Sequence, residues 1–244
     1  MRSRSRKISI RTLALLTAAL ILLASGGVFT TRAVLNIFGD NYDASLALGN
    51  IGVQMLENGS EVGDDGALFQ NVGDTDKQGN RFFAPGKKYN DTISVQNTGN
   101  EPEYVRVIVR KYWTKGNDKQ TALSPELIEL STDPDAWVKV SGTDDGLSVE
   151  TTIYYYKKQL ASGDEVTLTD AVRINESVLT QGRRVDLPTS SANVINYVYE
   201  FDGLRFNVDA EVQAVQTHDA VNAIKSVWGV DATIDGDGNI SSIG

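Results

Sequence analysis

The chain has 244 residues, with 32 acidic residues against 23 basic ones, and it contains one histidine and no cysteine. Its formal net charge of −9 disfavours nucleic acid and anionic membrane surfaces as partners, because like charges repel. The lack of cysteine excludes disulfides, thiolate metal sites and a cysteine nucleophile, so an apolar core must hold the fold together.

Residues 1–33 predict a secretory signal peptide. A basic head without acids covers residues 2–11, an apolar run follows at 13–24, and the small residues at 25–27 come next. A membrane-spanning helix needs about 20 apolar residues, which is longer than this run, so a removed signal is favoured over a membrane anchor. We predict cleavage after Ala33, with 25–27 as the alternative position.

Removal of the signal would make the chain more acidic. Six of the 23 basic residues and none of the 32 acidic ones lie in 1–33, so the formal net charge would fall from −9 to −15. The remaining residues, 34–244, fit a single β-sandwich domain in size. The expected location is outside the cell, in the extracellular matrix or at the cell surface, and a basic signal on a cysteine-free chain is associated with Gram-positive exporters.

The region between the signal peptide and residue 80 has segments typical of extended strands, followed by one typical of a loop. Short apolar alternation predicts an extended segment at 34–38 and a strand or strand pair at 44–56. Residues 57–80 are rich in Gly, Asp and Asn, which predicts a loop.

Residues 93–113 alternate apolar and polar side chains on both sides of a break at 97–100. This pattern predicts a strand, a turn and a second strand, which together form a hairpin. In the second strand, Val105, Val107 and Val109 share one face, which is expected to be buried, while the other face is mixed and partly wet.

The second half of the chain continues the strand pattern and ends with one helix. Segment 124–126 is either the start of a helix or part of a loop. Residues 217–228 have apolar side chains at helical spacing with Gly229 at the end, and 232–243 predict a terminal hairpin. We expect an all-β fold, a jelly-roll-like antiparallel β-sandwich with one or two short helices. Strands are also predicted at 137–140, 148–158, 163–175, 196–201 and 204–216.

No catalytic constellation is visible in the sequence. A zinc hydrolase needs two or three ligands, usually histidines at helical spacing, and His218 is the only histidine. It stands beside Thr217, which suits a capping position, so a helix-start residue is the favoured interpretation over a catalytic base. No catalytic residue and no cofactor are predicted, and the chain is not expected to be an enzyme.

One short stretch carries oxygen ligands at alternate positions. Asp235, Asp237 and Asn239 are spaced as in the beginning of a calcium loop. A full loop also needs a bidentate acid at its twelfth position, which this chain does not have. These residues remain weak metal candidates, and a hairpin turn is the favoured interpretation.

Three stretches together resemble the camelysin/TasA-type family, and more narrowly the clostridial alternate signal-mediated exported proteins. They are the end of the apolar run at 24–27, "NTGNEPEYVRV" at 97–107, and "AVQTHDAVNAIKSVWGVD" at 214–231. The resemblance implies export by a dedicated signal peptidase and a jelly-roll sandwich. In fibre-forming members, the mature N-terminal strand inserts into the next subunit and builds biofilm matrix fibres.

Carried onto this sequence, the resemblance implies a donor strand at 34–43. Its apolar residues would mediate polymerisation by β-strand exchange, with self-association as the main partnership and other matrix or cell-wall components as possible partners. A camelysin-like surface metalloprotease and a monomeric ligand-binding module are the alternatives, although one histidine gives the protease no support. The apolar residues of the donor segment are Val34, Leu35, Ile37 and Phe38.

Overall fold

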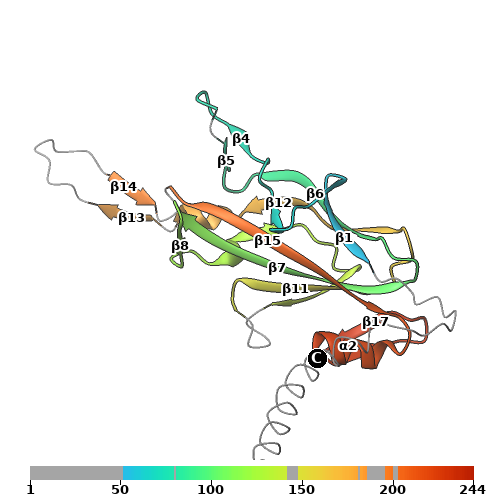
Figure 1. Ribbon diagram of the computed structural model, residues 1–244. Coiled ribbons are helices and arrows are strands. Elements are labelled where there is room, and N and C mark those ends of the chain that lie inside the picture. Colours follow the sequence, from blue (N-terminus) through green and yellow to red (C-terminus); the bar gives the residue numbers. More distant parts are fainter. Residues whose placement is uncertain (1–51, 80, 142–147, 181, 186–195, 200–202) are drawn as a thin grey trace, which may run out of the picture. The chain divides into compact units, whose positions relative to one another are not determined.

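The computed structural model describes residues 52–79, 81–141, 148–180, 182–185, 196–199 and 203–244, all within the compact unit Gly49–Gly244 (Figure 1). The described residues are mostly β, with antiparallel strand pairs throughout. The first sheet has the order β2 (Ser60–Glu61), β1 (Val53–Glu57), β6 (Lys88–Asn97), β12 (Glu165–Ile174) and β9 (Ile128–Leu130). The second has the order β10 (Trp137–Ser141), β11 (Thr151–Tyr156), β7 (Glu103–Lys115), β15 (Arg205–Gln216) and β3 (Ala67–Leu68), with β8 (Asp118–Gln120) also paired to β7.

Three small hairpins and a few helical turns complete the described elements. The hairpins join β4 (Asp74–Thr75) to β5 (Arg81–Phe82), β13 (Gly182–Val185) to β14 (Asn196–Tyr199), and β16 (Ala232–Ile234) to β17 (Ile240–Ile243). The helical elements are the 3-10 turns η2 (Pro125–Leu127) and η3 (Glu176–Thr180) and the α-helix α2 (Ala220–Trp228).

The facing sides of the two large sheets form the main apolar core. Val105, Val107 and Val109 of β7 are fully buried against Ile93 and Val95 of β6, which are also fully buried. Alternate residues of a strand point to opposite faces, so the period of two in the sequence placed these valines on the inner face as predicted. The all-β prediction is confirmed at the level of antiparallel sheets packed face to face.

The predicted hairpin at 93–113 is wrong in one respect, because its two strands lie in different sheets. β6 pairs with β1 and β12, whereas β7 pairs with β11, β15 and β8, so the connection crosses from one sheet to the other. The buried side chain of Asn97 forms this corner: its amide donates to the carbonyl oxygens of Glu101 (2.8 Å) and Leu160 (2.9 Å) and its oxygen accepts from the backbone N–H of Gly99 (2.7 Å). These bonds tie the turn to the backbone of the segment around Leu160 and give buried backbone groups hydrogen-bond partners.

Replacing Asn97 with alanine is expected to lower the free energy of unfolding by about 2–3 kcal/mol. The substitution removes three hydrogen bonds and leaves the Leu160 carbonyl without one of its buried partners. Urea unfolding of the variant measures the loss, with the exposed Asn90→Ala on the same strand as the matched control. Equal stability of the two variants would show that the corner does not depend on this side chain.

A second apolar cluster lies on the outer face of the second sheet, at the end where α2 and the β16–β17 hairpin pack. Tyr104 of β7, Tyr155 of β11 and Val215 of β15 belong to one cluster with Ile224 and Trp228 of the helix, and the rings of Tyr155 and Trp228 are in contact. The second sheet is therefore covered on both faces at this end. The outer face of β7, which was predicted to be mixed, is exposed to solvent only in the part of the strand that the helix does not cover.

The helix begins later than predicted and has a different cap. It starts at Ala220 after Asp219, which adopts the left-handed conformation (φ 51°) and makes no side-chain capping hydrogen bond, so Thr217 is not the capping residue. Gly229 ends the helix in the left-handed conformation (φ 72°), as predicted. Val227, another apolar residue of the predicted helix, is 62% exposed, and it lies roughly 60° from the centre of the buried stripe at 100° per residue.

The region 57–80, predicted as a loop, contributes two residues to the main core. Leu68 in β3 and Phe69 beside it are buried to 1% and 4% exposure, and β3 pairs with β15 at the sheet edge. The two-residue strand is too short to produce alternation, so its composition alone predicted a loop.

Candidate functional site

The residues singled out in the sequence do not gather into one site. The donor segment with Val34, Leu35, Ile37 and Phe38 lies outside the described residues, as do residues 44–51 of the strand predicted at 44–56. His218 is exposed in the turn before α2. Within the described part of the chain, no group of three or more His, Cys, Asp or Glu side chains is arranged to hold a metal ion.

The stretch Asp235–Asn239 forms the turn of the terminal hairpin. One carboxylate oxygen of Asp235 accepts from the backbone N–H groups of Asp237 (3.0 Å) and Asn239 (2.8 Å), and the backbone N–H of Gly238 donates to the Asp235 carbonyl (3.1 Å). These bonds lower the pKa of Asp235, with the Asn239 backbone bond as the largest cause. The carboxylate is thus occupied by its own turn.

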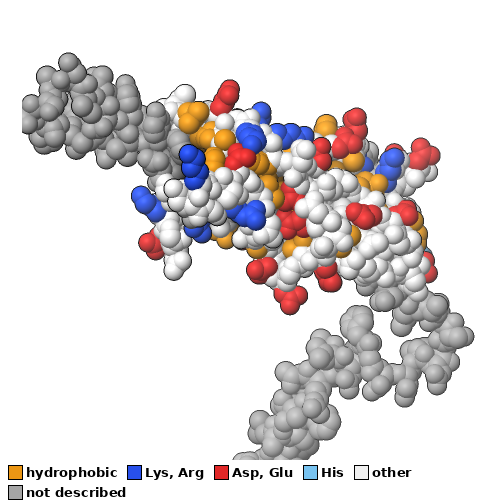
Figure 2. All heavy atoms as spheres, turned by 90° about the horizontal axis from the view of Figure 1, so that it is seen from above, with side chains coloured by type: hydrophobic (Ala, Val, Ile, Leu, Met, Phe, Trp, Pro, Cys, Tyr) orange, Lys and Arg blue, Asp and Glu red, His pale blue; other side chains and the backbone are white. Residues whose placement is uncertain are grey.

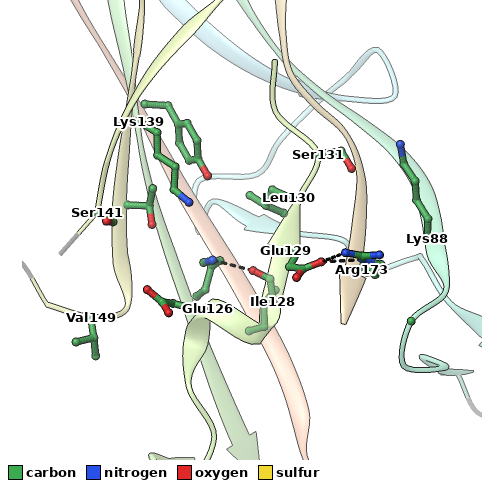
Figure 3. Close-up of a pocket in the computed structure, with 14 residues that line it drawn as sticks. Lys88, Glu126, Ile128, Glu129, Leu130, Ser131, Lys139, Ser141, Val149 and Arg173 are labelled. Atoms are coloured by element: carbon green, nitrogen blue, oxygen red, sulfur yellow. Dashed lines mark hydrogen bonds and ion pairs between the residues drawn. The ribbon is translucent and has the colours of Figure 1, made fainter. Parts of the chain in front are cut away.

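A polar cleft of about 710 Å³ lies between the sheets where the first sheet ends at the short strand β9 and the second continues to β10 (Figure 3). Lys139 and Ser141 of β10 line one side, and Lys88 and Arg173 of the first sheet line the other, with Glu129 between them. Most of its lining is polar and four of the lining side chains are basic, although the chain as a whole is acidic.

The cleft is built on positions that belong to the inner face of the second sheet. β7 places Val105, Val107 and Val109 inward, and the next residue on this face is Lys111, followed by Trp113. Trp137 of β10 is buried in the core, and Lys139 follows it on the same face. A buried polar side chain destabilises the fold unless it is hydrogen-bonded, and it is retained where it serves a function. Cations on the inner face of a sheet therefore mark a candidate functional site.

Lys111 is the most buried charge in the cleft, with 6% exposure. Its ammonium group donates to the carbonyl oxygen of Ile128 at 2.7 Å. The pKa of Lys111 is lowered to about 8, with burial as the largest cause and the charge of Lys139 as the second, whereas Glu126 and Glu129 act in the opposite direction. Both charge states of this lysine are therefore accessible near neutral pH.

Two of the other lining cations already have acidic partners. The guanidinium of Arg173 pairs with the carboxylate of Glu129 at 2.5 Å, and the amide of Asn175 donates to the same carboxylate at 2.5 Å. Burial alone would raise the pKa of Glu129, but these hydrogen bonds lower it. Lys88 pairs with Asp170 at 3.2 Å.

The floor of the cleft also carries a phenol that stays protonated. Burial raises the pKa of Tyr154 to about 12, with a smaller opposing effect from a hydrogen bond to Thr132. Thr152, buried at 4% exposure, lies on the same strand face. Neutral hydroxyl groups and ammonium groups therefore line the same floor, an arrangement that favours anions over cations.

The surface around the described residues carries both signs of charge. On the face shown in Figure 2, acidic and basic side chains are interspersed with apolar ones rather than segregated into fields of one sign.

Sequence reasoning missed the cleft, although one signal pointed to it. Lys111 continues the inward alternation of the three valines of β7, so a lysine occupied a predicted core position. A charged residue at a position that the strand alternation places in the core predicts either a buried ion pair or a functional site.

Comparisons of the chain with family models, with curated proteins and with solved structures found no match. Among the described residues, no helix has the length and apolar character needed to cross a membrane.

Proposed function

We propose that the chain is a secreted structural subunit of extracellular biofilm matrix or surface fibres and that it assembles by β-strand exchange. The observation that carries this proposal is the pair of open edges on one side of the sandwich. β10 pairs with β11 and β9 pairs with β12, and no strand of the described part of the chain pairs with their other sides.

Open edges favour the addition of a strand from another molecule. An edge strand presents unpaired N–H and C=O groups, and an added strand satisfies them through main-chain hydrogen bonds. β10 has five residues, Trp137–Ser141, which is enough to pair with a short donor. The proposal includes a jelly-roll order of strands, a signal peptide at 1–33 and membership of the camelysin/TasA-type family.

The donor in this proposal is residues 34–43 of the next subunit. Leu35 and Ile37 are two residues apart and would enter the sandwich from one face of the added strand. Insertion of one subunit's end into the edge of the next is a heterologous contact, which propagates as a filament because it does not close on itself.

Deletion of the donor tests the mechanism. Purified residues 34–244 are expected to form filaments in negative-stain micrographs and a ladder of oligomers on size exclusion, whereas residues 44–244 are expected to remain a folded monomer. Leu35→Asp with Ile37→Asp should reproduce the deletion, and Asn36→Ser is the matched control on the other face. Filaments formed by residues 44–244 would refute strand donation.

The polar cleft favours a second function, a monomeric ligand-binding module at the surface. The cations of the cleft stand on inner-face positions where an apolar core would otherwise be expected. A persistent monomer of residues 34–244 at raised concentration would favour this function over fibre assembly.

A further inference from the structure

We propose that the cleft between β9 and β10 binds a carboxylate group, which is held between the ammonium groups of Lys111 and Lys139. This inference concerns a ligand site and does not depend on strand exchange.

The first support is the unfilled hydrogen-bonding capacity of Lys111. An ammonium group has three N–H donors, and in the described part of the chain this one donates to a single acceptor, the Ile128 carbonyl. The side chain is more than nine-tenths buried, so bulk water has little access to the remaining donors. An acceptor atom of a ligand in the cleft would fill them.

The second support is the position of Lys139. Its side chain points into the cleft from β10, and within the described residues its ammonium group forms no hydrogen bond or ion pair (Figure 3). It repels the Lys111 ammonium strongly enough to affect the pKa of that group. A negative group between the two lysines would replace this repulsion with two attractions.

The third support is the charge balance, which selects the class of ligand. Arg173 is paired with Glu129, and Lys88 is paired with Asp170. The remaining lining charges are the two free ammonium groups and the carboxylate of Glu126, for which no ion pair is formed in the described residues. One positive charge is left over, which matches a singly charged carboxylate better than a doubly charged phosphate.

Binding should depend on pH through Lys111. The groups that face it are Lys139 on β10, Tyr154 on β11, Glu126 in η2 and Glu129 on β9, with Arg173 on β12 behind Glu129. Of these, Tyr154 has a pKa of about 12 and the pKa of Glu129 is lowered, whereas the pKa of Lys111 is lowered to about 8, so we assign the change between pH 7 and 9.5 to Lys111. Loss of its charge is expected to weaken carboxylate binding about fivefold, the factor that corresponds to one ion pair of about 1 kcal/mol.

The test is an NMR titration with sodium acetate against matched sodium chloride, on isotope-labelled residues 34–244 that carry Leu35→Asp with Ile37→Asp and are therefore expected to stay monomeric. We expect saturable shifts of the Lys111, Ile128 and Lys139 amides at pH 7 and an affinity about fivefold lower at pH 9.5. Lys139→Met, an exposed position that should not affect folding, is expected to lose about fivefold, and Lys111→Met at least as much. Lys225→Met, an exposed lysine of α2 paired with Asp231, is the matched control and should bind as the parent does.

The outcomes separate this inference from the proposed function. Absence of saturable shifts in the cleft, or acetate affinity unchanged by Lys139→Met, would overturn the carboxylate site whether or not filaments form. Phosphate binding more tightly than acetate would overturn the assignment of the ligand class. If acetate binds, its effect on self-association of the parent chain shows how the site relates to the β10 edge. Competition indicates that the added strand of a second copy covers the same lysines, and no effect indicates a site for a free small acid.

Discussion

Replacing Trp228 with alanine is expected to destabilise the protein by about 3–5 kcal/mol, because it removes the largest side chain of the second core. Trp228 is 6% exposed, and its ring centre lies 5.6 Å from that of Tyr155. The guanidinium of Arg106 lies over the indole at 5.1 Å from the ring centre. Urea unfolding followed by circular dichroism measures the loss in free energy.

Arg106 makes this site more than an apolar contact. Its guanidinium donates two hydrogen bonds to the side-chain oxygen of Gln213 (3.0 and 2.8 Å) and one to the Trp228 carbonyl (3.3 Å). No ion pair to a carboxylate is formed by this buried cation within the described residues, so the two rings and these acceptors must stabilise its charge. Removal of the indole therefore costs the cation contact as well as the buried area.

Two further variants separate the contributions at Trp228. Trp228→Phe keeps an aromatic ring and removes an indole N–H that is buried without a hydrogen-bond partner in the described structure, so it should cost less than half as much as alanine. Val227→Ala is the matched control in the same helical turn and, at 62% exposure, should change stability by less than about 0.5 kcal/mol. A loss below about 1 kcal/mol for Trp228→Ala would show that the helix is not anchored by this side chain.

The sequence predicted which strand faces are buried better than it predicted which strands pair. Alternation placed Val105, Val107 and Val109 on the inner face of β7, because the period of two is a local property of the chain. β6 and β7 belong to different sheets, and the corner between them holds Asn97, whose partner Leu160 is 63 residues away in sequence. A turn-like composition at 97–100 fits both a hairpin and a crossing between sheets.

The cleft could not be predicted for a similar reason. Lys111 and Lys139 belong to different strands of one sheet, and Ile128 and Glu129 come from the edge of the other. Their meeting depends on where the first sheet ends, and the three residues of β9 are too few to produce a pattern. The alternation along β7 alone identified Lys111 as a charged residue at a core position, but it did not identify the residues that surround it.

Replacing Lys111 with methionine is expected to change how stability depends on pH. Below pH 8 the folded protein holds a buried ammonium group that water solvates in the unfolded chain, at a cost of about 3 kcal/mol for a shift from 10.5 to about 8. Between pH 8 and 10.5 the unfolded chain still binds a proton that the folded protein has released, so the stability of the parent rises with pH.

The variant has no such group, so its advantage should be greatest at neutral pH and disappear in base. We expect Lys111→Met to be about 1–2 kcal/mol more stable than the parent at pH 7, after the lost hydrogen bond to Ile128 is subtracted. The difference should fall by about 3 kcal/mol by pH 10.5, when urea unfolding is measured at several pH values. Lys225→Met, with its exposed ion pair, should show no such change, and a constant difference for Lys111→Met would mean that the buried lysine keeps an ordinary pKa. Because the same charge would hold a carboxylate in the cleft, binding should weaken around pH 8, at the start of the range over which the cost to folding declines.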